Sequence, residues 1–173
     1  MNKISWTGGC QCGAVRYELL QPPQDAHLCH CRMCQKQFGN FFAALCSVPK
    51  EMFRVTRGTV ANFRSSANVQ RGFCRDCGTP LTYEPLDRAT ISVSIGSLDN
   101  HTAVPPLVQY GIEAREPWFD SLTDLPAFVS GEDENGSSSF ARLLPGIRTS
   151  NRQHPDHDTP VWPALATWVA EPR

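Results

Sequence analysis

Gly9-Cys10-Gln11-Cys12-Gly13 is the first of two cysteine pairs that organise this chain, and Cys74-Arg75-Asp76-Cys77-Gly78 is the second. Side chains two residues apart on an extended chain point to the same face, a Cys-x-x-Cys turn aims both sulfurs at one point, and the adjacent glycines can take a positive φ. Four thiolates are a preferred ligand set for a structural zinc ion. We therefore predict a closed zinc site whose metal-binding free energy, on the order of 10 kcal/mol, adds to folding. Its predicted ligands are Cys10, Cys12, Cys74 and Cys77.

A third group, Cys29-His30-Cys31-Arg32-Met33-Cys34, supplies three thiolates and no evident fourth ligand. An open fourth position is typical of a catalytic zinc ion. Three thiolates make that ion a weak Lewis acid for carbonyls, but they suit it to holding an incoming thiol in its reactive thiolate form. We predict that Cys29, Cys31 and Cys34 hold a catalytic zinc, that the chemistry involves a thiol, and that this second site is the less fully occupied one.

Three other residues lie near enough in sequence to close the second site, and the pattern leaves open whether one of them does. His30 alternates with its neighbouring cysteines, so we expect its ring to face away. Cys46 lies in an apolar run and is expected to be a core thiol, whereas His27 is expected to be partly exposed. Further along, His154 and His157 are expected to be solvated in a polar tail.

Composition narrows the class of protein. The chain has 173 residues, of which 40% are hydrophobic and 19% charged, and its net charge is −1. That charge argues against binding of nucleic acid through its phosphates. We identify no secretory signal and no membrane span, so the eight cysteines favour metal sites over disulfides. We expect a cytoplasmic protein.

Short alternating runs at 8–12 residue spacing predict a mainly β fold. Examples are residues 14–19, with Val15, Tyr17 and Leu19 on one face, and residues 90–95. The one convincing helix covers residues 32–38, and Gly39 suits its C-terminal end. The other predicted strands cover residues 41–47, 52–56, 59–64, 69–74 and 81–84.

The composition changes beyond Phe128, which predicts a zinc-binding domain over residues 5–128 and a Pro-, Ser- and Arg-rich tail over residues 129–173, partly docked or flexible. Residues 130–139 are polar and without apolar period, as in a linker. Residues 161–169 are apolar enough to dock on the domain or on a partner, which makes a homodimer through the tail one possibility.

Three segments together resemble the glutathione-dependent formaldehyde-activating enzyme family, whose domain also occurs in centromere protein V. The resemblance covers residues 5–128, and Ser94-Ile95-Gly96-Ser97-Leu98-Asp99 and Pro117-Trp118-Phe119-Asp120 resemble its later motifs. The segments are Gly9-Cys10-Gln11-Cys12-Gly13-Ala14-Val15-Arg16-Tyr17, Cys29-His30-Cys31-Arg32-Met33-Cys34-Gln35-Lys36 and Phe73-Cys74-Arg75-Asp76-Cys77-Gly78-Thr79-Pro80-Leu81.

The resemblance implies a β-tent fold of packed short antiparallel sheets with two zinc ions, divided among the cysteines as above. It also implies a carbon–sulfur lyase that joins glutathione and formaldehyde as S-hydroxymethylglutathione, or splits that adduct. Glutathione carries two carboxylates, and Arg32, Arg71 and Arg75 lie near the cysteine motifs, but we expect these arginines at the solvated surface.

Two other functions compete with the enzyme. In one, both zinc ions are structural and the chain is a non-catalytic protein-binding module, which a fourth protein ligand on the second ion would favour. In the other, the chain is a nucleic-acid-binding zinc ribbon. The scattered arginines and the net charge of −1 rank that function last.

Overall fold

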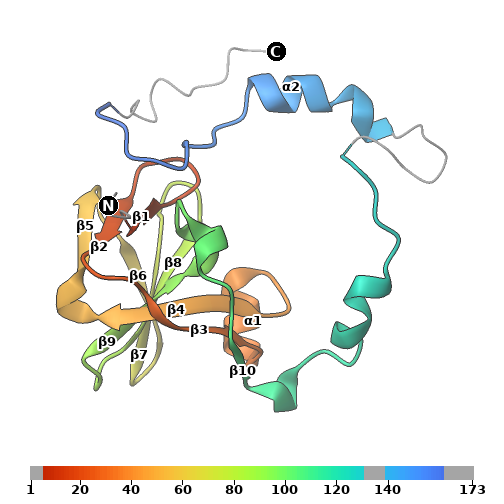
Figure 1. The fold of residues 1–173 in the computed structure, drawn as a ribbon. Coiled ribbons are helices and arrows are strands. Elements are labelled where there is room, and N and C mark those ends of the chain that lie inside the picture. The colour runs from red at the N-terminus through yellow and green to blue at the C-terminus, as the bar shows by residue number, and fades with distance from the viewer. Residues whose placement is uncertain (1–5, 131–138, 162–173) are drawn as a thin grey trace. The chain divides into compact units, whose positions relative to one another are not determined.

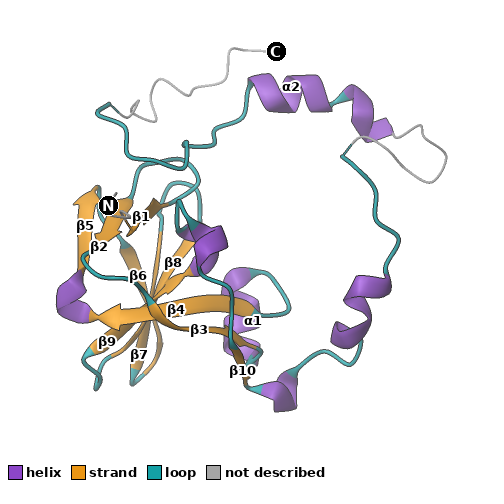
Figure 2. Ribbon diagram, in the orientation of Figure 1, coloured by secondary structure: helices purple, strands orange, loops and turns teal. Residues whose placement is uncertain are grey.

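Ten β-strands dominate the part of the chain that the computed structural model describes, residues 6–130 and 139–161 (Figures 1 and 2). The chain divides into two compact units. The described part of the first covers residues 6–115 and 154–161, and that of the second covers residues 116–130 and 139–153. All ten strands and both cysteine-rich regions lie in the first unit.

The strands form two sheets, which confirms the predicted mainly β fold. The smaller sheet has the order β1 (Trp6–Gly9), β2 (Arg16–Leu19) and β5 (Phe53–Arg57). The larger has the order β10 (Val108–Tyr110), β3 (Gln24–Cys29), β4 (Ala43–Pro49), β9 (Thr90–Ser94), β8 (Pro80–Pro85), β7 (Val69–Phe73) and β6 (Ala61–Ser66). Neighbouring strands are antiparallel except β10, which runs parallel to β3 and so departs from the wholly antiparallel expectation.

The predicted helix is present as α1 (Arg32–Phe38). It ends where Gly39 takes a left-handed conformation, with φ of 58°, and donates its backbone N–H to the carbonyls of Gln35 and Lys36. A glycine adopts this conformation without the steric penalty of a Cβ. At its other end the helix begins at Arg32, directly after Cys31, so Cys34 lies in its first turn.

Alternating residues of both sheets form one core. Val15, Tyr17 and Leu19 are buried, and so are Ile91, Val93 and Ile95 of the predicted run over residues 90–95. The Tyr17 hydroxyl lies 2.7 Å from Ser97 Oγ, which satisfies its polar end inside that core. The sequence did not predict three of the strands, because they are short or interrupted by polar residues. These strands are β1, β3 and β10.

The segment 154–161 packs on the first unit, which corrects the expectation of a solvated His154. Only 8% of His154 is exposed, and its backbone N–H donates to Gln11 O at 2.7 Å. Asp158 accepts from Arg16 Nε at 2.8 Å. His157 is exposed, as expected. The histidine is buried because the segment lies across the loop between β1 and β2, which no local pattern indicates.

The second unit contains α2 (Leu144–Thr149) and two short 3-10 helices, Phe119–Asp124 and Ser139–Arg142. The remaining 3-10 helices belong to the first unit: Lys50–Met52, Ile95–Ser97, His101–Ala103 and Ile112–Ala114. Most of the predicted linker, and the apolar run from Trp162 onward, lie outside the described residues. Among the helices described, none is long and apolar enough to cross a membrane.

Candidate metal centres

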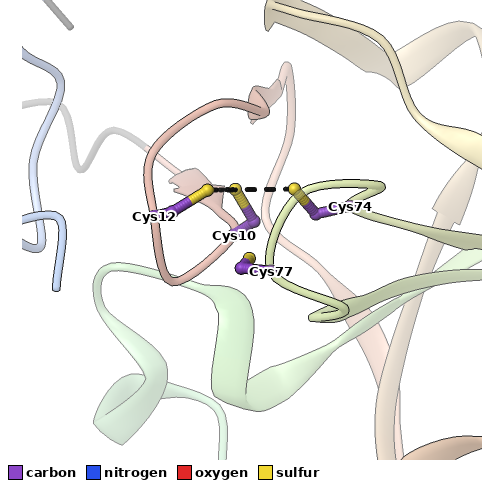
Figure 3. Close-up of side chains that lie close together, drawn as sticks. All are labelled: Cys10, Cys12, Cys74 and Cys77. Atoms are coloured by element: carbon purple, nitrogen blue, oxygen red, sulfur yellow. Dashed lines mark hydrogen bonds between the residues drawn. The ribbon is translucent and has the colours of Figure 1, made fainter. Parts of the chain in front are cut away.

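The first centre lies between two loops that are far apart in sequence. Cys10 and Cys12 belong to the loop between β1 and β2, and Cys74 and Cys77 to the loop between β7 and β8. Figure 3 shows the four sulfurs converging from the two loops. All four lie within 4.8 Å of one another, so the structure brings together the predicted structural set.

Backbone hydrogen bonds hold each loop in the conformation that aims its sulfurs inward. The Gly13 N–H donates to Cys10 O at 3.0 Å, and the Gly78 N–H donates to Cys74 O at 2.9 Å. Both glycines have positive φ, 78° and 76°. The Cys10–Cys12 pair therefore sits in a turn, whereas we expected an extended chain. The Gln11 N–H joins the two loops by donating to Thr79 Oγ1 at 3.1 Å.

The sulfur spacing fits a tetrahedral zinc ion. Zinc–sulfur bonds of about 2.3 Å place tetrahedral sulfurs about 3.8 Å apart, and the Cys10–Cys12 and Cys12–Cys74 sulfur pairs are separated by 3.6 and 3.9 Å. Burial raises the pKa of the Cys10, Cys12 and Cys74 thiols to about 11. Burial also opposes ionisation of Cys77, but hydrogen bonds from Thr79 and from the Cys12 backbone outweigh it and lower that pKa to about 6.

The second centre forms where β3 meets α1. Cys29 ends β3, Cys31 precedes the helix, and Cys34 lies in its first turn. Their sulfurs lie within 4.8 Å of one another, so the structure also brings together the predicted catalytic set. Strand β10 supports this segment from the side, because the His30 N–H donates to Tyr110 O at 2.9 Å.

The three sulfurs differ in burial and charge. Cys34 is 1% exposed, whereas Cys29 and Cys31 are half-buried. A hydrogen bond from Cys34 lowers the pKa of the Cys29 thiol to about 5, and the same hydrogen bond together with burial raises the pKa of Cys34. As ligands of a metal ion all three cysteines would be thiolates, and three thiolates would suit a zinc ion with one position left open.

A cavity of about 430 Å³ opens beside the second centre. All three cysteines line it, together with His27, Arg71 and further residues of the larger sheet. The first centre differs, since three of its four cysteines are at most 6% exposed. The structure therefore pairs a set of four cysteines, three of them buried, with a set of three that lines a cavity.

The three possible fourth ligands of the second centre lie elsewhere. Over residues 6–130 and 139–161, the metal-binding group at this site comprises the three cysteines and no further His, Cys, Asp or Glu. His30 is fully buried, with Nε2 2.9 Å from Gln109 Oε1. Cys46 lies in the core, as expected. His27 is 9% exposed, more buried than expected, and its Nδ1 lies 2.7 Å from Asp25 O.

Arg71 was wrongly expected at the surface. It is 2% exposed, and its Nη1 and Nη2 lie 3.6 and 3.5 Å from Cys34 Sγ. The predicted strand over residues 69–74 contains the signal that could have located it, because Arg71 shares an alternate face with Val69 and Phe73. By contrast, Arg32 and Arg75 are exposed, as expected.

Three comparisons relate this chain to known proteins. The model of the glutathione-dependent formaldehyde-activating enzyme family matches residues 5–113. A Schizosaccharomyces pombe protein named as an uncharacterized lyase is 27% identical over 78 residues, 45% of this chain and 56% of its own length. The chain thus spans just over half the length of that relative. A Rhodobacter sphaeroides crystal structure aligns with a TM-score of 0.49 at 25% identity, covering 60% of this chain and 98% of the other.

Proposed function

We propose that this chain, which belongs to the glutathione-dependent formaldehyde-activating enzyme family, is a zinc-dependent carbon–sulfur lyase that makes or breaks a thiol–aldehyde adduct. The observation that carries the proposal is the set of three cysteine sulfurs facing a cavity, with no fourth His, Cys, Asp or Glu ligand among the described residues. The relative named as a lyase supports the same reaction class.

The two centres would have different roles. Cys10, Cys12, Cys74 and Cys77 would hold a structural zinc ion, and Cys29, Cys31 and Cys34 would hold a catalytic one. When bound at three thiolates, zinc supplies a position at which an incoming thiol is stabilised as its thiolate. The alternative of a binding module with two structural zinc ions requires a fourth protein ligand at the second centre, and the described residues provide none.

His27 is placed to carry the proton of the reaction. Its Nδ1 lies 2.7 Å from the Asp25 carbonyl oxygen, which can only accept, so Nδ1 donates to it and Nε2 is the ring nitrogen left for the reaction. His27 lines the same cavity as the cysteines. In the forward direction a carbon–sulfur bond forms as the carbonyl π bond breaks, and the thiol proton moves to the aldehyde oxygen. We assign that transfer to His27 Nε2.

The substrates we propose are a glutathione-like thiol and a small aldehyde such as formaldehyde. The cavity of about 430 Å³ admits such an adduct. Arg88 lines the cavity and is exposed, so its guanidinium is available to a carboxylate of the thiol substrate.

The test is a titration of the zinc-loaded protein with glutathione, followed by zinc-edge X-ray absorption. We expect a fourth sulfur to enter the coordination of one of two zinc ions, and we expect the protein to accelerate adduct formation from labelled formaldehyde in NMR spectra. Cys46→Ala is the matched control, because this core thiol belongs to neither cluster. If no sulfur enters with any thiol tried, the proposed function is wrong.

A further inference from the structure

Arg71 brings a buried positive charge to the second centre. It is 2% exposed on β7, and both of its terminal nitrogens reach Cys34 Sγ, at 3.6 and 3.5 Å. A guanidinium is rarely buried so completely unless an anion pairs with it. Across the described ranges of the chain, no carboxylate forms a salt bridge with Arg71. With a metal ion bound, the Cys34 thiolate would be that anionic partner.

Neutral groups hold this guanidinium in place. Arg71 Nε donates to Ser65 Oγ at 3.1 Å, and Nη1 donates to Gln37 Oε1 at 3.2 Å. Its central carbon lies 4.9 Å from the centre of the Tyr83 ring, in a cation–π contact. The contacts with Ser65, Gln37 and Tyr83 therefore hold the guanidinium in place against the sulfur of Cys34.

We propose that Arg71 is a positioning residue whose charge, acting through Cys34, lets the three-cysteine centre accept a fourth, anionic sulfur. The proposal rests on the proposed function, because it presupposes that a thiol enters this centre. Three thiolates and one divalent cation sum to a charge of −1, and an incoming thiolate would make it −2. Arg71 returns that total to −1, and because both Arg71 and Cys34 are buried, water screens the interaction between them only weakly.

The hydrogen bonds act in the same direction as the charge. A sulfur that accepts two charge-assisted hydrogen bonds donates less electron density to a metal ion. The ion would therefore hold a further anionic ligand more firmly. A neutral incoming ligand gains little from this arrangement, because it adds no negative charge.

Ligand preference separates this role from simple support of the fold. The protein is loaded with Co²⁺, and 2-mercaptoethanol and imidazole are titrated separately while the visible absorption of the thiolate-bound cobalt is recorded. In Arg71→Gln we expect the dissociation constant for the thiol to rise roughly 10–100-fold, the usual effect of losing an outer-sphere partner. The dissociation constant for imidazole should stay close to that of the unchanged protein.

Two further variants complete the experiment. Arg71→Lys keeps the charge and should retain the preference for the thiol over imidazole, even if the loss of the planar fork weakens both. Arg64→Gln is the matched control. This arginine lies on the neighbouring strand β6, is exposed, and donates to Ala67 O. This variant should behave like the unchanged protein.

The outcomes distinguish this proposal from the proposed function. Equal losses of thiol and imidazole affinity in Arg71→Gln, or an unchanged thiol affinity, would overturn the role of Arg71 alone. The same holds if Arg71→Lys loses the preference for the thiol. If the unchanged protein takes up imidazole but no thiol, the proposed function is wrong and this proposal fails with it.

Discussion

Replacing Asp99 by asparagine should destabilise the fold far more than the same change at Asp158, although both carboxylates bond to one guanidinium. Arg16 is 3% exposed, and it donates Nη1 to Asp99 Oδ1 at 2.9 Å and Nη2 to Asp99 Oδ2 at 2.5 Å. Its Nε donates to Asp158 Oδ1 at 2.8 Å. The two acids differ in exposure, 10% for the Asp99 side chain and 49% for that of Asp158.

The burial difference sets the expected magnitudes. Removing one partner of a buried ion pair costs about 3–5 kcal/mol, because the other charge is left without compensation. Asp99→Asn should fall at the lower end, about 3 kcal/mol, since Asp158 still bonds to Arg16. Asp158→Asn removes a half-exposed partner that solvent already screens, so it should cost less than about 1 kcal/mol.

The assay is urea unfolding of the zinc-loaded protein and its two variants at neutral pH and low salt. The free energy of unfolding should fall in the order unchanged protein, Asp158→Asn, Asp99→Asn, and added salt should erase mainly the Asp158 effect. Equal losses in the two variants, or a larger loss at Asp158, would refute the view that burial decides the strength of these bonds.

The pH dependence of the free energy of unfolding tests the interaction of Asp99 with Arg16 independently. Burial by itself would raise the pKa of this carboxyl group, but hydrogen bonds from Arg16 and Thr7 outweigh it and hold the pKa below the ordinary value of 3.8. A lowered folded pKa means that the stabilisation is complete above the unfolded pKa and is lost as the pH falls through the folded one. The difference in the free energy of unfolding between the unchanged protein and Asp99→Asn should therefore be constant near neutrality and shrink below pH 3.8.

Four further substitutions, in three experiments, test other parts of the structure. Cys77→Ser should unfold the domain, whereas Cys31→Ser should leave its melting temperature nearly unchanged and abolish thiol uptake; equal thermal losses would contradict the division of roles. Gly58→Ala should lower the free energy of unfolding by more than about 1 kcal/mol, because φ is +68° and a Cβ would lie 2.0 Å from Ala14 O. Burial and the neighbouring arginines lower the pKa of His154 below 6.5, so stability should fall as the pH drops below that value. His154→Gln should flatten this slope in urea titrations at several pH values.

Local chemistry made much of the fold predictable. The helix over residues 32–38 ends at Gly39, whose left-handed backbone the sequence could indicate because glycine adopts it without steric penalty. The alternation around Tyr17 identified a buried strand face. Cysteine spacing divided seven sulfurs into the same two groups that the structure brings together, because Cys-x-Cys and Cys-x-x-Cys each aim two sulfurs at one point within a short loop.

Contacts between distant segments were not predictable in this way. Arg71 is buried because β7 lies between β6 and β8 and faces Cys34, which is 37 residues earlier in the chain. His154 is buried because its segment reaches back to Gln11. The immediate sequence of His154 does not differ from that of a surface residue, whereas the strand alternation that places Arg71 on one face with Val69 and Phe73 does not show that this face is buried against Cys34. In both cases the side chain was expected at the surface and lies instead beside a cysteine-rich segment, Arg71 beside Cys34 and His154 beside the loop of Cys10 and Cys12.

Strand β7 links the two metal centres through a single short segment. Arg71 on this strand contacts Cys34 of the second centre, and Cys74, three residues later, belongs to the first. A zinc ion at the first centre would hold the end of β7 against the loop of Cys10 and Cys12. We therefore expect the position of the Arg71 guanidinium to respond to the four-cysteine loop, although its direct contacts are to Ser65, Gln37, Tyr83 and Cys34. Partial loss of metal from the first centre should consequently weaken thiol binding at the second before the sheet unfolds, which links the structural site to the reaction that we propose.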